Sequence, residues 1–188
     1  MIGALLAAAT ALSSPALIAR CDALASHPSD PDRVTVGIET AEVDLNAAEA
    51  ACRAAHQAAP DHARTAYHLG RVIHYQKRYA EAVPLLEQAA GGGYRQAIFV
   101  LGFILTLDEP GVPKDICRTL SLWRRSAALD HPWSGYYLVD GQISGAFASC
   151  PNPVTDTERV RYLDLAQRGV TVAASAGPIE ALVAKAGR

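Results

Sequence analysis

The chain has 188 residues, with 17 Lys and Arg against 19 Asp and Glu and a formal net charge of −2. A nucleic-acid-binding protein usually carries a basic face, and neither this balance nor a basic tail favours that class. Half of the residues are hydrophobic, which is enough to build a core in one domain or a short repeat array.

The N-terminal stretch predicts an export signal. Residues 1–19, MIGALLAAATALSSPALIA, contain no charge, and an Ala- and Leu-rich run is followed by Ser, Pro and small residues. This order is typical of a secretory signal peptide, with cleavage expected after Ala19 and Ala25 as the alternative. The run is short for a membrane span and is broken by Ser-Ser-Pro. A buried alanine-rich helix in a cytoplasmic protein is the alternative to export.

The cysteines add to this interpretation. Four follow the predicted cleavage site, at Cys21, Cys52, Cys117 and Cys150. An even number behind an export signal predicts two disulfides, whereas in the cytosol the same residues would be buried thiols. Because no Cys-x-x-Cys pair occurs, neither a zinc site nor a thioredoxin-type redox site is expected.

Residues 26–44 predict an irregular segment, since Pro28, Pro31 and Gly37 discourage regular structure. From there the apolar residues recur at helical spacing. The predicted helices cover residues 45–59, 63–76, 79–90, 97–107, 116–130, 133–143, 156–169 and 181–186.

Several helices have boundary signals. Asp44, Asp115 and either Thr155 or Asp156 can cap the helices that follow them. Pro84 falls too late for the first turn of the predicted 79–90 helix, so this helix is expected to start late or to kink. Trp123 shares a helix face with apolar residues, and we expect it in the core. These neighbours are Ile116, Leu120 and Ala127.

The helices repeat in pairs. The second helices end in similar segments, at 85–90, 122–128 and 162–169, and the first helices share the 66–70 and 97–102 pattern. Small residues such as Gly70 and Gly102 let antiparallel helices approach closely. One hairpin cannot bury its apolar face alone, whereas stacked hairpins can. The sequence therefore predicts an all-α fold, an α-solenoid of stacked antiparallel helix hairpins.

Residues 94–130 resemble the Sel-one-like repeat (SLR) branch of the tetratricopeptide repeat (TPR) superfamily. The matching residues are an alanine, a Leu-Gly pair, a Gly-Val-x-x-Asp turn, a tryptophan and an Ala-Ala ending: Ala97, Leu101-Gly102, Gly111-Val112, Asp115, Leu122-Trp123 and Ala127-Ala128. The family's usual tyrosine and glycine before the turn are missing. Residues 63–93 look like a plain tetratricopeptide unit, and 45–60 and 131–169 like degenerate copies. The resemblance implies an extended concave surface, formed mainly by the first helices, that holds peptides or proteins.

Stacking also predicts which cysteines pair. Cys117 lies near the start of a second helix, and Cys150 follows the next first helix at the same edge of the stack. Residues 20–26 are compatible with a short helix lying antiparallel to the one that carries Cys52. Because the Cα atoms of a disulfide must approach within about 7 Å, we expect Cys21–Cys52 and Cys117–Cys150.

Two groups of residues are candidates for a site. His56, His62, His68 and His74 are spaced by six residues, about 600° of helix, so successive side chains face different ways and packing or surface roles are expected rather than a metal site. The densest aromatic cluster is Trp133, Tyr136 and Tyr137. It predicts either core between repeats or a partner-binding patch.

These observations predict four segments: a signal peptide at 1–19, an N-terminal segment and loop at 20–44, a helical repeat domain at 45–169, and a tail or capping helix at 170–188. No catalytic, cofactor-binding or metal-binding motif is found, so we expect a non-enzymatic interaction module in the periplasm or secreted from a bacterium, binding a protein or peptide and no nucleic acid. The alternatives are an envelope enzyme or carbohydrate-binding protein acting on cell-wall material, and a cytoplasmic repeat scaffold.

Overall fold

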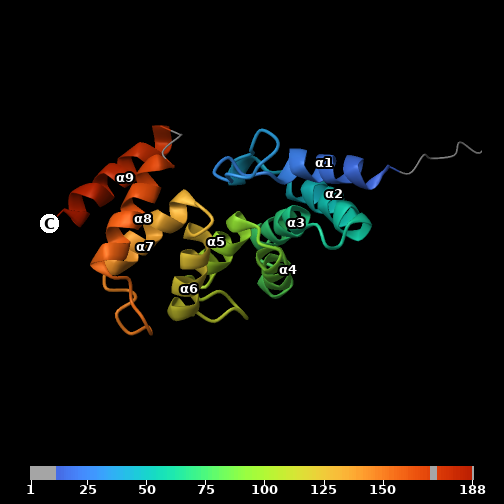
Figure 1. Ribbon diagram of the computed structural model, residues 1–188. Helices are drawn as coiled ribbons and strands as arrows, with labels where there is room; N and C mark the ends of the chain where they lie inside the picture. Colours follow the sequence, from blue (N-terminus) through green and yellow to red (C-terminus); the bar gives the residue numbers. More distant parts are fainter. Residues whose placement is uncertain (1–11, 170–172, 188) are drawn as a thin grey trace, which may run out of the picture.

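The computed structural model describes residues 12–169 and 173–187, and its regular elements in these ranges are helices (Figure 1). The α-helices are α1 (Ser14–Ala25), α2 (Leu45–Ala58), α3 (Ala63–Tyr75), α4 (Tyr79–Gly91), α5 (Arg95–Ile104), α6 (Ile116–Ala127), α7 (Pro132–Ile143), α8 (Asp156–Arg168) and α9 (Ala173–Ala186). A short 3-10 helix, η1, covers Thr40–Glu42.

Consecutive helices form hairpins, and each hairpin packs on the next. The helices α1, α3, α5 and α7 are the first members of the hairpins, and α2, α4, α6 and α8 are the second. The last helix, α9, packs against α7 and α8 at the end of the stack. This arrangement confirms the prediction of an all-α solenoid of helix hairpins.

The predicted caps explain where three helices begin. The Asp44 carboxylate accepts hydrogen bonds from two backbone N–H groups of the first turn of α2. Asp115 accepts one from the Arg118 N–H at 2.9 Å at the start of α6. Thr155 and Glu158 form a reciprocal capping box at the start of α8. These short-range signals are confirmed because they depend only on neighbouring residues.

The helix α4 starts at Tyr79, as the predicted range of 79–90 has it, and Pro84 lies inside it, so the late start does not occur. A tight turn at Lys77, which has a φ of 62°, reverses the chain directly after α3 and brings α4 alongside it. Other predicted boundaries are wrong. The helix α5 covers 95–104 instead of 97–107, and the chain turns at Asp108, with a φ of 53°. At the other end, α9 begins well before residue 181 and contains Pro178.

The helix α1 extends across the predicted cleavage position. Its first half, residues 14–19, belongs to the predicted signal peptide, and its second half carries Cys21 and Ala25. Leu17 and Ile18 are partly buried against the core between α1, α2 and α3. The other residues of the predicted signal, 1–11, lie outside the described residues. Cleavage after Ala19 stays a prediction.

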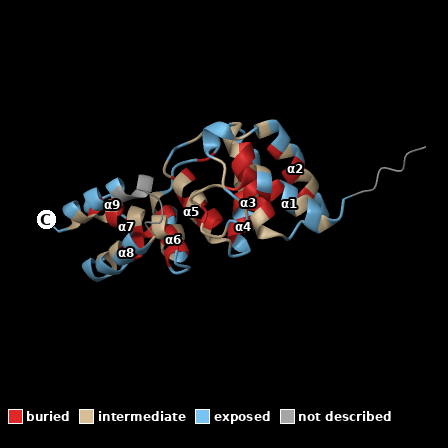
Figure 2. Ribbon diagram, turned by 90° about the horizontal axis from the view of Figure 1, so that it is seen from above, coloured by how far each residue is buried: buried red, intermediate tan, exposed pale blue. Residues whose placement is uncertain are grey.

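Within residues 12–169 and 173–187, the buried hydrophobic side chains form three clusters along the stack (Figure 2). Trp123 belongs to one of them and is 4% exposed, and its indole N–H donates to the Phe99 carbonyl at 3.1 Å. The expectation that Trp123 is core is confirmed. A Cβ atom at Gly102 would lie 2.7 Å from the indole nitrogen of Trp123, so this glycine permits the close approach of α5 and α6.

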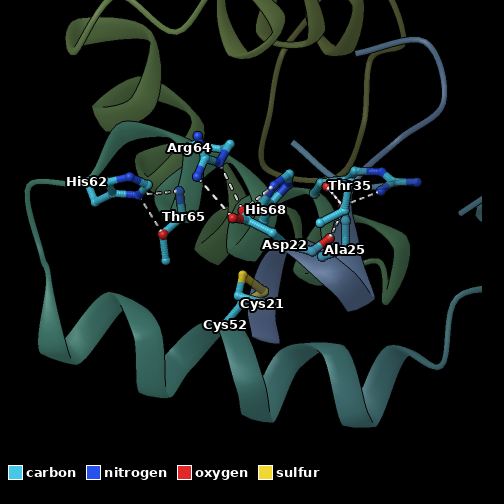
Figure 3. Close-up of a disulfide and its surroundings, with 11 residues drawn as sticks. Cys21, Asp22, Ala25, Thr35, Cys52, His62, Arg64, Thr65 and His68 are labelled. Atoms are coloured by element: carbon cyan, nitrogen blue, oxygen red, sulfur yellow. Dashed lines mark hydrogen bonds and ion pairs between the residues drawn. A yellow bond between two sulfur atoms is a disulfide. The ribbon is translucent and has the colours of Figure 1, made fainter. Parts of the chain in front are cut away.

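Disulfides join neighbouring elements at both ends of the stack. Cys21 of α1 bonds to Cys52 of α2 (Figure 3), and Cys117 of α6 bonds to Cys150, which follows α7. These are the pairs expected from the stacking argument. Among the helices of residues 12–169 and 173–187, none is long and apolar enough to cross a membrane.

Candidate functional site

A groove of about 280 Å³ crosses the first helices of the middle hairpins. Its floor and walls come from α3, α5, α7 and the loop that follows α1. Most of the lining side chains are aromatic or aliphatic. They are His27, Ser29, Tyr67, Arg71, His74, Tyr75, Gln96, Phe99, Val100, Phe103, Ile104, Trp133 and Tyr137.

The aromatic lining has a regular origin in the sequence. Residues four apart on a helix lie on the same face, one turn from each other. Three of the first helices place such residues on the groove: Tyr67, Arg71 and Tyr75 on α3, Phe99 and Phe103 on α5, and Trp133 and Tyr137 on α7. The groove is therefore built by the repeat itself, because successive hairpins present the same helix face.

Arg71 brings a positive charge to the floor of this groove. Its residue is 2% exposed, and its guanidinium donates to the Tyr75 hydroxyl at 2.8 Å, the Ala25 carbonyl at 2.5 Å and the Ile38 carbonyl at 3.2 Å. The last two contacts tie α3 to the last residue of α1 and to Ile38 in the segment between α1 and α2. Among the ion pairs of the described residues, none includes Arg71.

His27 faces the groove as a neutral hydrogen-bond donor. Its Nδ1 accepts the Ser29 N–H at 3.0 Å, so this nitrogen is not protonated. Burial and the positive charge of Arg71 lower the pKa of His27 to about 4. At neutral pH the single ring proton is therefore on Nε2.

A chain of hydrogen bonds orients Gln96 at the groove. The Ser134 N–H donates to Nδ1 of His131 at 3.3 Å, and Nε2 of His131 lies 2.6 Å from the Gln96 side-chain oxygen. Burial and the nearby Arg95 lower the pKa of His131 to about 3, so its ring is neutral and its proton is on Nε2. Because the Gln96 oxygen accepts this proton, its amide NH2 is the donor, and it hydrogen-bonds the Tyr67 hydroxyl, which also lines the groove.

The 26–44 loop forms one wall and is held by polar contacts across the stack. The Tyr94 hydroxyl donates to Asp30 at 2.6 Å, and Arg95 makes two bonds of 2.8 Å to Asp32. Burial raises the pKa of Asp30, although the hydrogen bond from Tyr94 opposes this shift. The sequence predicted an irregular segment here but not its attachment to α5.

Beneath this wall, α1 is fixed to α3 next to the Cys21–Cys52 disulfide (Figure 3). Arg64 makes two hydrogen bonds to Asp22, and Nε2 of His68 lies 3.2 Å from the same carboxylate. His62 accepts the Thr65 N–H at the start of α3. These histidines have packing and capping roles, and within the described residues no group of three His, Cys, Asp or Glu side chains is placed to hold a metal ion.

The predicted aromatic cluster divides between groove and surroundings. Trp133 and Tyr137 line the groove, whereas Tyr136 packs edge-on against both rings without lining it. Tyr137 also packs on Trp123 with ring centroids 5.0 Å apart, so it belongs to core and groove at once. The sequence interpretation missed Arg71 and the other polar lining residues. The aromatic residues that recur four positions apart in the first helices are the sequence signal that indicates the groove face.

Comparisons with known proteins bear on the fold alone. Neither a scan of protein-family models nor a search of curated proteins finds a match. Among solved structures, the chain is similar to a Sel1 repeat protein from Oxalobacter formigenes, with a TM-score of 0.56 and 19% sequence identity over 72% of this chain. The match covers 51% of that structure, so the chain spans about half of its length. The likeness shows that the hairpins stack as they do in a Sel1 repeat protein.

Proposed function

We propose that the protein is a non-enzymatic interaction module, a repeat scaffold that binds a peptide or protein partner in the groove of α3, α5 and α7. The observation that carries this proposal is the aromatic lining supplied by three successive first helices. Aromatic residues gathered in a well-packed hollow are typical anchors of protein interfaces. Repeat proteins of this architecture use the surface of stacked repeats for binding.

The chemistry of the lining favours binding over hydrolysis of cell-wall material. Hydrolysis of sugar chains usually requires two carboxylates on either side of the bond that is cut. Neither Asp nor Glu is among the residues that line the groove in the described part of the chain. His27, with a pKa of about 4, is a weak base at neutral pH. An envelope enzyme stays the second candidate, without an observation in its favour at this site.

We place this module in the bacterial envelope. Two disulfides and no free cysteine among the described residues suit an oxidising compartment such as the periplasm. The charge-free N-terminal run supplies a route there. Cleavage after Ala19 would keep Cys21 and its bond to Cys52, whereas cleavage after Ala25 would remove Cys21. The disulfide therefore favours the first position.

Partner capture from an envelope fraction, with crosslinking, tests the binding surface. Val100→Glu would place a charge on the groove, and Val160→Glu would make the same exchange on α8, where Val160 is 68% exposed. We expect a stoichiometric partner that the wild type and Val160→Glu capture and Val100→Glu does not. If circular dichroism shows that both variants are folded and both capture the partner equally, the binding surface lies elsewhere.

Cell fractionation with N-terminal sequencing tests the location. The expected product is periplasmic or secreted and begins at Arg20. A cytoplasmic product that begins at Met1 would contradict export and would favour the cytoplasmic scaffold.

A further inference from the structure

We propose that the groove recognises an acidic side chain, Asp or Glu, of an extended peptide, whose neighbouring apolar side chain packs on the aromatic walls. This inference rests on the proposed function and names the chemistry of the partner.

The buried charge of Arg71 is the first observation. Arg64 and Arg95 each have a carboxylate that accepts two of their hydrogen bonds. Arg71 is more deeply buried, at 2% exposed, yet its partners are two backbone carbonyls and a phenol. A buried charge is normally paired with an opposite one, since its desolvation is costly. The guanidinium also has more N–H groups than these three bonds use.

Two neutral side chains that line the groove with Arg71 also supply hydrogen-bond donors. Nδ1 of His27 and the side-chain oxygen of Gln96 are already occupied, so His27 offers its Nε2 proton and Gln96 its amide NH2, which also hydrogen-bonds the Tyr67 hydroxyl in the lining. The Tyr75 oxygen already accepts from Arg71 and Thr40. The groove thus combines one cation with neutral donors, and the described residues that line it contribute no carboxylate. Such a site favours an anionic acceptor and disfavours a cation.

The position of Arg71 favours a carboxylate on a side chain of the peptide as the anion that binds there. Arg71 is on the floor, whereas Trp133 and Val100 are only partly buried. The carboxylate of Glu or Asp can reach the floor while the peptide backbone stays at the rim. The next apolar side chain can then contact the rings of Phe103 and Trp133, which buries apolar area without further polar groups.

Blocked tetrapeptides test this directly on the full-length oxidised protein. The probes are acetyl-Ala-X-Phe-Ala-amide with X as Glu, Gln or Lys, and the same Gln peptide with a free C-terminal carboxylate. Trp133 lines the groove and Trp123 is buried, so the fluorescence of Trp133 reports binding. We expect the Glu peptide to bind about tenfold more tightly than the blocked Gln peptide, as for a hydrogen bond to a charged group. The Lys peptide should bind more weakly still.

A variant should abolish the expected preference without removing Arg71, which also holds the loop. Gln96→Glu keeps an oxygen acceptor for His131 and puts a carboxylate into the groove that Arg71 also lines. We expect it to lose the preference for the Glu peptide over the Gln peptide. Val160→Glu adds the same charge on α8, away from the groove, and should keep the preference unchanged. Melting curves of both variants control for folding.

The outcomes separate the two proposals. Equal binding of the blocked Glu and Gln peptides, or stronger binding of the free-acid Gln peptide than of the Glu peptide, overturns the acidic side chain as the ligand. Absence of binding by all four peptides overturns it as well. In each case, the capture experiment decides about the proposed function separately. If Val100→Glu abolishes capture of the protein partner, the proposed function still holds. If Val100→Glu captures the partner as well as the wild type does, the proposed function is overturned too.

Discussion

Arg64 donates two parallel hydrogen bonds to the Asp22 carboxylate, from Nε to Oδ1 and from Nη2 to Oδ2, each 2.9 Å long. The pair joins α1 to α3 across 42 positions of sequence, and Asp22 is 2% exposed. Burial by itself would raise the pKa of Asp22, but the adjacent His68 imidazole and the Arg64 guanidinium outweigh it and hold this pKa below its usual value. The carboxylate is therefore ionised in the folded protein and fixes the first hairpin to the second.

Replacing Asp22 tests this attachment. Asp22→Asn keeps the shape of the side chain but removes its charge, which leaves Arg64 without its counter-ion. We expect the free energy of unfolding to fall by about 2–4 kcal/mol, somewhat less than for a fully buried pair because Arg64 is partly exposed. Urea unfolding of the oxidised protein at pH 7 measures it.

A surface pair supplies the matched control. Asp164→Asn breaks the ion pair with Arg168, in which both side chains are more than 60% exposed (64% and 63%). The expected change is within about 0.5 kcal/mol, since exposed pairs contribute little. An equal decrease in the free energy of unfolding for both variants would mean that the Asp22–Arg64 pair contributes no more to stability than a surface ion pair.

Gly102 is expected to tolerate no side chain. In Gly102→Ala the new methyl group would meet the Trp123 indole, so α5 and α6 must separate or the ring must move. Overpacking of this kind costs about 1–3 kcal/mol. Gly91→Ala is the control, because a Cβ there has no heavy atom within 4 Å and alanine favours the end of α4 by about 0.5–1 kcal/mol. Thermal unfolding that shifts the same way in both variants would contradict this account.

Trp123 should matter for stability and not directly for binding. Trp123→Ala removes a large buried ring and the hydrogen bond to Phe99, so we expect a loss of about 3–5 kcal/mol. Trp133→Ala removes a partly exposed groove residue and should cost less stability but weaken peptide binding. An unchanged melting temperature for Trp123→Ala, together with lost binding, would show that the two tryptophans have the opposite roles.

His131 makes stability depend on pH. Its folded pKa of about 3 lies below the ordinary value of 6.5, so between these pH values the unfolded chain binds a proton that the folded protein does not. The free energy of unfolding is therefore not reduced by His131 above pH 6.5, and it decreases as the pH falls from 6.5 toward 3. Between pH 7 and pH 5 the expected loss from this one residue is about 2 kcal/mol.

The variant His131→Asn isolates this contribution. Asparagine can still cap α7, but it does not titrate. His27, with a folded pKa of about 4, acts in the same direction and remains in the variant. We therefore expect the pH 5–7 slope of the unfolding free energy to decrease without vanishing. An unchanged slope would show that His131 is protonated in the folded protein as readily as in the unfolded one.

Much of the fold could be predicted from the sequence because its signals are local. Asp44, Asp115 and Thr155 cap the helices that directly follow them, and helical spacing placed Trp123 on a core face. The effect of Pro84 on α4 and the length of α9 could not be predicted in this way. Proline argues against a continuous helix locally, at Pro84 and Pro178, and the helices form nevertheless, α4 packed along α3 and α9 against α7.

The site was less predictable, because its polar part depends on contacts between distant residues. Arg71 becomes a buried cation only when Ala25 and Ile38, 46 and 33 positions away, place their carbonyls on it. Gln96 presents its amide to the groove only because His131 holds its oxygen. Trp133 and Tyr137 were singled out as an aromatic cluster, and both line the groove, but nothing in their own segment indicates which residues face them.

The two disulfides divide the chain into segments of very different freedom. The bonds close residues 21–52 and 117–150 into covalent rings, and residues 53–116 lie in neither ring. This unlinked stretch carries α3 and α5, which supply most of the groove. In the unfolded protein the rings remain closed, so residues 21–52 and 117–150 have less conformational entropy to lose on folding than the stretch between them. A bound peptide would therefore stabilise a stretch that lies outside both disulfide rings, and binding would protect it against local unfolding and proteolysis.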